Sequence, residues 1–149
     1  MGYYYMNENP TVAEYKLDDI EPGLKKNFKV TITESMSNDF ARLTGDNSPI
    51  HMNEHYARAT YFNQRICHGM LLGSFFSRLI GMHLPGKEGL CLSYSIRHLL
   101  PCFLNQEINV EGIVLTKSNA TRIITLKATI TDSSGKLLVD GLLKVLVRK

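Results

Sequence analysis

The sequence predicts an α+β fold in which an antiparallel sheet wraps around one central helix. One observation behind this prediction is a single strongly apolar segment of helical length, residues 69–83. A second is the series of strand-like runs that follows this segment. The turns between the last three runs are short, which favours antiparallel neighbours. At 149 residues the chain is long enough for one sizeable core, so we expect one domain.

The first expected elements are a strand and a helix. Residues 24–32 alternate apolar and polar side chains with the period of a strand. Thr33 is a suitable N-cap for a helix to about residue 44, in which apolar residues recur at spacings of four and three. A shorter helix is expected from Asn53 to about Ala59.

Residues 69–83 form the expected central helix, which would be about 22 Å long. Arg78 is the one charged residue within it, and the apolar residues cover more than one stripe of the helix. Such a helix should be buried along most of its circumference. Leu84-Pro-Gly86 ends it.

Four strands are expected after this helix. The first begins near residue 89, where apolar residues alternate with cysteine and serine. The other three are residues 107–117, 122–132 and 137–147, separated by short turns at 118–120 and 132–135. These last three strands should form an antiparallel meander.

Composition excludes several classes of protein. With 44% hydrophobic and 21% charged residues, the chain is neither disordered nor collagen-like. No apolar run reaches the length of a membrane span, and the N-terminal residues lack the pattern of a secretory signal. We therefore expect a flexible tail over residues 1–12 and a single domain over residues 13–149, with no membrane association.

Charge and cysteine content bear on the expected partners and location of the protein. The net charge of +3 is mild, and no basic run is interleaved with aromatic residues, so nucleic acid is not expected as a partner. Cys67, Cys91 and Cys102 have no close pairing pattern, which suits reduced thiols in the cytoplasm. A catalytic thiol at Cys67 remains an alternative to a small buried residue.

The most informative stretch is Leu43-Thr-Gly-Asp-Asn-Ser-Pro-Ile-His51. Gly45 can end a helix in the left-handed conformation, and Pro49 prevents the segment from being one continuous helix. Asp46 and His51 are thus presented from a constrained loop. A carboxylate and an imidazole that share one water make a minimal acid–base device. The alternative is structural, with Asp46 as a turn residue and His51 at the opening of the next helix.

The start of the central helix is a second candidate feature. The Gly69 N–H lies in a first helical turn, where donors are free and the helix dipole is positive, so it could hold a developing enolate oxygen. Gly69 could equally relieve crowding between helix and sheet. Ser77 could orient Asp46, or its hydroxyl could bond the carbonyl one turn earlier.

Two further patterns, a histidine spacing and a set of cationic residues, could suggest a metal or phosphate site. His51-Met-Asn-Glu-His55 has the spacing of one class of zinc protease, but no clear third ligand presents itself, so no metal site is expected. A cationic set could meet a phosphate, although solvated surface positions are the default; its members are Arg58, Arg65, Lys87 and Arg97.

Three segments together resemble a known family. They are Phe40-Ala-Arg-Leu-Thr-Gly-Asp-Asn-Ser-Pro-Ile-His51, then Tyr56-Ala57 with Phe62, and Ile66-Cys-His-Gly-Met-Leu71. This combination is similar to the MaoC-like (R)-specific enoyl-CoA hydratases, over about residues 20–147. The resemblance implies a hot-dog fold, usually as a homodimer or higher homo-oligomer in which one sheet continues across both subunits.

The resemblance also implies roles for individual residues. Asp46 and His51 fall on the catalytic pair and Gly69 on the oxyanion-hole glycine. Ser77 falls on the serine that often orients the aspartate, and Phe62 on a substrate-binding position. Ser48 stands where the family usually has an asparagine, and its shorter hydroxyl offers one donor where an amide offers two.

The implied reaction is hydration of a trans-2-enoyl thioester or the reverse dehydration of an (R)-3-hydroxyacyl thioester, carried by CoA or acyl carrier protein. Such a lyase needs no metal or redox cofactor, since the thioester itself stabilises the charge. Two alternatives remain. One is a hot-dog thioesterase, and the other is a non-catalytic acyl-thioester binding or accessory subunit, which the departure at Ser48 keeps open.

Overall fold

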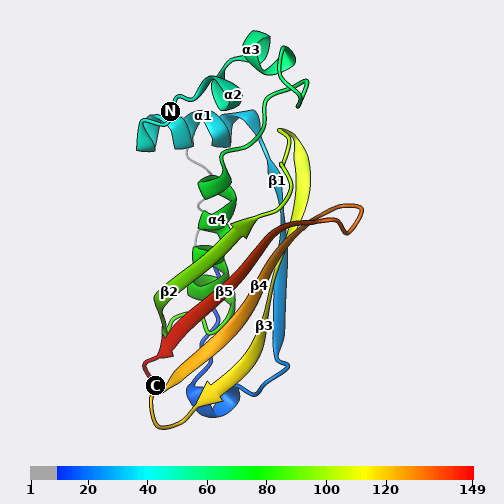
Figure 1. Ribbon diagram of the computed structural model, residues 1–149. Helices are drawn as coiled ribbons and strands as arrows, with labels where there is room; N and C mark the ends of the chain where they lie inside the picture. Colours follow the sequence, from blue (N-terminus) through cyan, green and yellow to red (C-terminus); the bar gives the residue numbers. More distant parts are fainter. Residues whose placement is uncertain (1–9) are drawn as a thin grey trace.

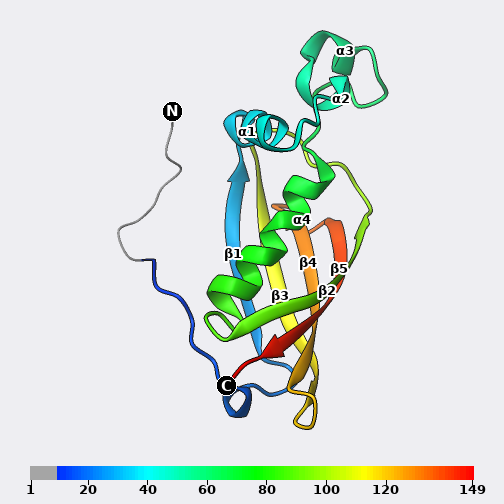
Figure 2. The same ribbon diagram turned by 90° about the vertical axis from the view of Figure 1, so that its left-hand side faces the viewer.

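A five-stranded antiparallel sheet wraps around one helix in the computed structural model, which describes residues 10–149 (Figures 1 and 2). The strand order within this described part is β1-β3-β4-β5-β2. The predicted α+β architecture is confirmed. The predicted tail at residues 1–12 falls mostly outside the described residues, and the Ala13 N–H already donates to Met82 O at 3.0 Å.

The first strand and helix follow the local signals of the sequence. After a short 3-10 turn at Leu17–Asp19, β1 spans Lys25–Ile32 and α1 spans Glu34–Thr44. The Thr33 hydroxyl accepts from the Met36 N–H at 3.2 Å, so Thr33 is the expected N-cap. Gly45 ends α1 in the left-handed conformation with a φ of 79°.

Two short helices follow the loop after α1. They are α2 (Pro49–Met52) and α3 (Glu54–Arg58), where the sequence predicted one helix from Asn53. The Asn53 side chain caps α3 by accepting from the Tyr56 N–H at 2.9 Å. Both helices project beyond the end of the sheet (Figure 1), and α2 lies against α1.

The central helix differs from its prediction in two ways. The α-helix α4 covers Gly69–Arg78, and the last turn, Leu79–His83, is a π-helix in which the Leu84 N–H donates to Leu79 O at 2.9 Å. Burial along most of the circumference is wrong for the single chain. The sheet curls around one side only, so Leu72 and Phe76 are buried whereas Met70 is 62% exposed.

The remaining strands are β2 (Gly89–His98), β3 (Gln106–Ser118), β4 (Ile123–Asp132) and β5 (Leu137–Val147). The last three form the predicted antiparallel meander. By contrast, β2 pairs with β5 at the far edge, because the segment after β2 crosses to the opposite side before β3 begins.

The core lies between the concave face of the sheet and α4. Apolar side chains from alternate strand positions pack there; those that are fully buried include Ile32, Val110, Leu126, Ile130 and Leu143. Small residues let the helix lie close to the sheet. A Cβ at Gly141 would come within 2.8 Å of the Phe76 ring, and one at Gly112 would come within 2.7 Å of Leu79.

The two edges of the sheet have different surfaces. On the β1 edge, Lys25 and Lys29 form ion pairs with glutamates of β3. On the β2 edge, Leu90, Leu92 and Tyr94 are each about half exposed. Charged side chains protect an edge from further strand pairing, whereas an apolar edge invites it. None of the helices formed by residues 10–149 is both long and apolar enough to cross a membrane.

Candidate active site

Asp46 is held in a tight turn directly after α1. The Asp46 N–H donates to Thr44 Oγ1 and the Ser48 N–H donates to Asp46 Oδ1, both at 3.2 Å. The structural alternative raised for Asp46 is therefore present, because one carboxylate oxygen bonds its own turn. The residue is nevertheless exposed, and its second oxygen is available to a ligand. Ser48 N-caps α2, but its hydroxyl makes no capping bond.

His51 is the third residue of α2, and a backbone contact fixes its ring. His51 Nδ1 lies 2.9 Å from Ile66 O, which can only accept a hydrogen bond. The proton must therefore sit on Nδ1, which leaves the Nε2 lone pair free to take a proton. The ring is half-buried and faces the His68 ring, with the two centroids 4.2 Å apart.

The fold brings Asp46, His51 and His68 together. One ligand atom from each lies within 4.8 Å of the others. Two hydrogen bonds of about 2.8 Å each, meeting at one water, span such a gap. That Asp46 and His51 hold a single water stays a prediction.

This cluster also has the composition of a metal site, but His68 is fully engaged. His68 Nε2 lies 2.9 Å from Asp46 O, and His68 Nδ1 lies 3.1 Å from Ser37 Oγ. Only Asp46 and His51 would remain free as ligands, fewer than a zinc site uses. The cluster includes neither Glu54 nor His55, the other members of the protease-like spacing.

Gly69 begins α4, so its N–H belongs to the first turn, where amides have no acceptor within the helix. A Cβ at Gly69 would lie 3.2 Å from the His98 ring, so glycine here does relieve crowding against β2. The same lack of a side chain leaves the amide open to a ligand. Both of the interpretations proposed for Gly69 are thus compatible with its surroundings.

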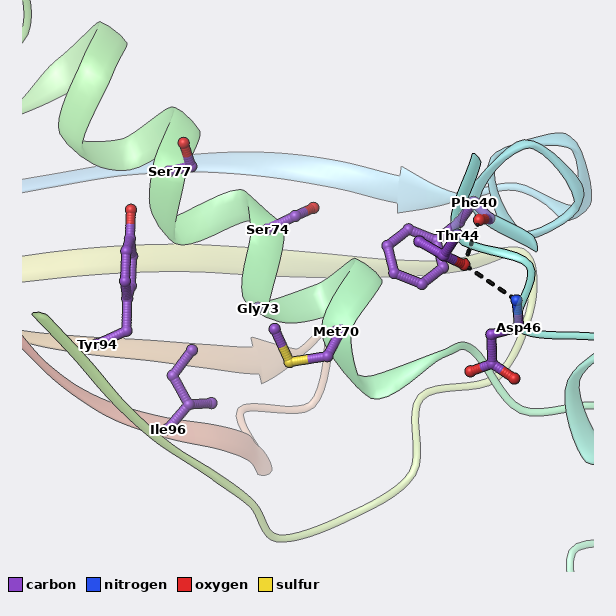
Figure 3. A pocket seen from close by; sticks show the side chains of 9 residues that line it. All are labelled: Phe40, Thr44, Asp46, Met70, Gly73, Ser74, Ser77, Tyr94 and Ile96. Carbon is purple, nitrogen blue, oxygen red and sulfur yellow. Dashed lines mark hydrogen bonds between the residues drawn. The ribbon is translucent and has the colours of Figure 1, made fainter. Parts of the chain in front are cut away.

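Two separate cavities are each lined in part by the start of α4. The larger, of about 620 Å³, extends along the exposed side of α4 and is lined by Asp46, Phe40, Thr44, Met70, Gly73, Ser74, Ser77, Tyr94 and Ile96 (Figure 3). The smaller, of about 420 Å³, includes His51, Phe62, Gly69 and His98 in its lining. Asp46 thus opens into one cavity, and His51 with Gly69 into the other.

Ser77 lies at the end of the larger cavity opposite Asp46 (Figure 3). It lies eight positions after Gly69, which corresponds to about 12 Å along a helix. Its hydroxyl interacts with Tyr94, whose pKa is raised to about 12, chiefly by burial. The role of Ser77 toward Asp46 stays a prediction. Ser74, one turn earlier, is the serine that bonds a helix carbonyl, at 2.6 Å from Leu71 O.

Cys67 and Cys102 are buried structural residues rather than catalytic thiols. Burial raises the pKa of the Cys67 thiol, with a smaller contribution from Cys102. Burial likewise raises the pKa of Cys102 to about 12. Because the thiolate is the reactive form, neither residue is suited to nucleophilic attack.

Arg65 corrects one sequence interpretation. It is 7% exposed, not a solvated surface residue. Its guanidinium donates to His51 O at 2.5 Å, Glu34 Oε1 at 2.6 Å and Asn38 Oδ1 at 3.0 Å, and so ties α2 to α1. The sole signal in the sequence is that Arg65 is the one charged residue between Arg58 and Arg78. Arg58, Lys87 and Arg97 are exposed, as expected.

A comparison with known families identifies the chain. The model of the MaoC-like domain matches residues 18–135. The chain belongs to the MaoC-like domain family. It is 31% identical to an (R)-specific enoyl-CoA hydratase of Rhodospirillum rubrum over 142 residues, which cover 95% of this chain and 97% of that protein.

Other members of the family support the same assignment. An (R)-specific enoyl-CoA hydratase of Aeromonas caviae is 39% identical over 68% of this chain and 76% of its own length. The unliganded R-hydratase of Pseudomonas aeruginosa superimposes with a TM-score of 0.88 at 30% identity, over 93% of this chain and 88% of that one. These similarities confirm the family resemblance and the hot-dog fold predicted for this MaoC-like protein.

Proposed function

We propose that this protein catalyses the reversible, (R)-specific hydration of trans-2-enoyl-CoA. The observation that carries the proposal is the grouping of Asp46 and His51 within reach of one water, next to the first amide of α4. The similarity to proteins named (R)-specific enoyl-CoA hydratase supports the same activity.

The first step is placement of the thioester beside the start of α4. Its carbonyl oxygen accepts from the Gly69 N–H, where the helix dipole favours a developing negative charge. The acyl chain extends into the larger cavity between α4 and β2, which Met70, Tyr94 and Ile96 make apolar. Phe62 lines the smaller cavity and contacts the substrate from the side of His51.

The second step is addition of water across the double bond. One hydrogen of the water is directed at His51 Nε2 and the other at Asp46, so an oxygen lone pair faces C3. As the C3–O bond forms, His51 takes a proton and the electrons move to the thioester oxygen, which Gly69 stabilises as the enolate. The protonated His51 then returns a proton to C2, which restores the thioester and the neutral imidazole.

A direct assay tests this function. Purified protein is incubated with crotonyl-CoA and longer trans-2-enoyl-CoAs, and the absorbance of the conjugated thioester, free thiol and product chirality are followed. Loss of the conjugated absorbance with formation of the (R)-3-hydroxyacyl product supports the proposal. Release of thiol alone would indicate a thioesterase, and binding without turnover an accessory subunit. The same series with acyl carrier protein thioesters decides the carrier.

We also propose a homodimer joined through β2. The β2 edge carries half-exposed apolar side chains, and the adjoining side of α4 is uncovered in the single chain, with Met70 62% exposed. Pairing of β2 with its symmetry mate would make one sheet across both subunits and cover these surfaces. The larger cavity lies between β2 and α4, so the partner would also close the substrate site.

A cytoplasmic location is the last part of the proposal. All three cysteines lie in the described part of the chain and are free thiols. Unpaired cysteines are typical of reducing compartments. Thioester substrates carried by CoA or acyl carrier protein suit the same environment.

A further inference from the structure

His68 occupies a buried position between the candidate catalytic residues. It is 1% exposed and immediately precedes Gly69 as the N-cap of α4. Its ring packs against the rings of Phe40 and His51, with centroid separations of 5.0 and 4.2 Å. The proposed reaction uses no atom of this side chain.

The hydrogen bonds of His68 specify one tautomer. The Asp46 carbonyl can only accept, so His68 Nε2 carries the proton and donates to it at 2.9 Å. His68 Nδ1 is then unprotonated and accepts from the hydroxyl of Ser37, which is fully buried on α1, at 3.1 Å. Burial is the main cause that lowers the pKa of His68, and the nearby ionisable groups are His51, Asp46 and Arg65. The ring is therefore neutral at neutral pH.

We propose that His68 is a positioning residue that sets the relative placement of Asp46, His51 and Gly69. It holds Asp46 through the backbone carbonyl, supports His51 through ring-to-ring contact, and places Gly69 through their shared peptide bond. Ser37 completes the arrangement, because its hydroxyl anchors the ring to α1. This inference rests on the proposed hydratase function.

An imidazole suits this position for three reasons. It combines an acceptor for Ser37, a donor for Asp46 and a flat face for His51 in one rigid group. Acid–base catalysis depends on sub-ångström placement, so a small shift of one partner lowers turnover while the substrate can still bind. Loss of His68 should therefore lower kcat more than it raises KM.

Two variants of His68 separate its contacts. In His68→Gln the terminal amide can reach the position of Nε2 and donate to Asp46 O. In His68→Asn the shorter amide reaches only the position of Nδ1, beside Ser37. We expect kcat on crotonyl-CoA to fall less than about tenfold in His68→Gln and about a hundredfold in His68→Asn, with KM within about threefold of wild type. Ser37→Ala should lower kcat about fivefold, the effect of one hydrogen bond.

A control separates positioning from loss of stability. Leu126→Ala removes a buried side chain of β4 and should lower the melting temperature while kcat stays near wild type at a temperature where the variant remains folded. Nitrogen NMR of the histidine rings should show His68 protonated on Nε2. A second readout is the melting temperature of the two His68 variants, which should be similar even though their kcat values differ.

Several results would overturn the inference. One is equal kcat values in wild type, His68→Gln and His68→Asn. Another is a loss of kcat that follows melting temperature in every variant, Leu126→Ala included. A His68 ring protonated on Nδ1 would also contradict it. These results differ from failure of the proposed function, in which the wild-type protein itself hydrates no enoyl thioester and both proposals are lost.

Discussion

Arg65 donates to the backbone carbonyl of His51 at 2.5 Å, across 14 residues of sequence. The same guanidinium also bonds Glu34 and Asn38 on α1. One buried cation thus holds the end of α2, and with it His51, against the first helix. The Arg65 side chain is almost fully buried. Removing it or its partners should therefore lower the free energy of unfolding.

We expect Arg65→Ala to lower the free energy of unfolding by about 1–3 kcal/mol, since His51 O, Asn38 and the exposed Glu34 all lose their donor. Arg65→Lys keeps the charge but not the fork of donors, so its loss should be smaller. Urea unfolding measures both. Arg58→Ala is the control, because its pair with Glu54 is exposed and should contribute less than about 1 kcal/mol. Equal effects of Arg65→Ala and Arg58→Ala would contradict this account.

Asp46→Asn and His51→Ala should each lower turnover by about 10²–10⁴. Each removes a group that holds or deprotonates the water, while neither side chain is part of the apolar core. Steady-state hydration of crotonyl-CoA is the measurement, with melting temperature to confirm folding. His55→Ala, on the exposed surface of α3, should retain activity. More than about a third of wild-type activity in either dyad variant would show that the pair is wrongly assigned.

Ser48→Asn should leave kcat/KM unchanged or raise it, because an amide supplies the second donor and the longer reach that the family usually has at this position. Ser48→Ala should cost only about 1 kcal/mol in kcat/KM, as its hydroxyl makes no capping bond and water can take its place. Both variants are compared with wild type on one enoyl-CoA. A loss beyond a hundredfold in both would give Ser48 its own chemical role, and the simple Asp46–His51 account would be abandoned.

Sedimentation equilibrium at micromolar protein should show a species of twice the 16.8 kDa chain mass. Leu92→Lys should shift it to the monomer and lower hydration, because a charge on the β2 edge opposes pairing with the partner strand. The control is Leu115→Lys on the interior strand β3, which should stay dimeric. A wild-type protein that remains monomeric would rule out the proposed dimer.

Stability should decrease as the pH falls below neutrality, partly through His83. Its Nε2 is buried without a hydrogen-bond partner in the described structure, and its ring stacks on Phe28 at 4.7 Å. Burial, with Arg78 and Lys26 nearby, lowers the pKa of His83 in the folded chain. The unfolded chain therefore binds a proton first, and stability is lost as pH falls through the unfolded pKa toward the lower folded one.

His83→Leu tests this contribution. In this variant the free energy of unfolding should fall less steeply as the pH decreases. Some decrease should remain, because burial also lowers the pKa of His68. His55→Ala serves as the control because His55 is exposed. An unchanged acid limb in His83→Leu would refute the assignment to His83.

The local signals in the sequence determined much of the fold. Thr33 and Gly45 bracket α1 because their effects depend on a few neighbouring backbone groups. The alternation of the last strands and their short turns likewise determined the meander. The loop that presents Asp46 and His51 could also be predicted from the sequence, because a nearby glycine and proline constrain its backbone.

Tertiary structure decided what depends on distant partners. Arg65 and His68 are bonded to α1 residues 27 to 31 positions earlier, so no local pattern marks either as a positioning group. The one-sided burial of α4 and the cavity beside it follow from the curl of the sheet and the placement of β2 at its edge. Sequence alone thus determined which residues could do chemistry, and the packing of distant elements decided which of them meet, because hydrogen bonds and ring contacts require proximity in space rather than along the chain.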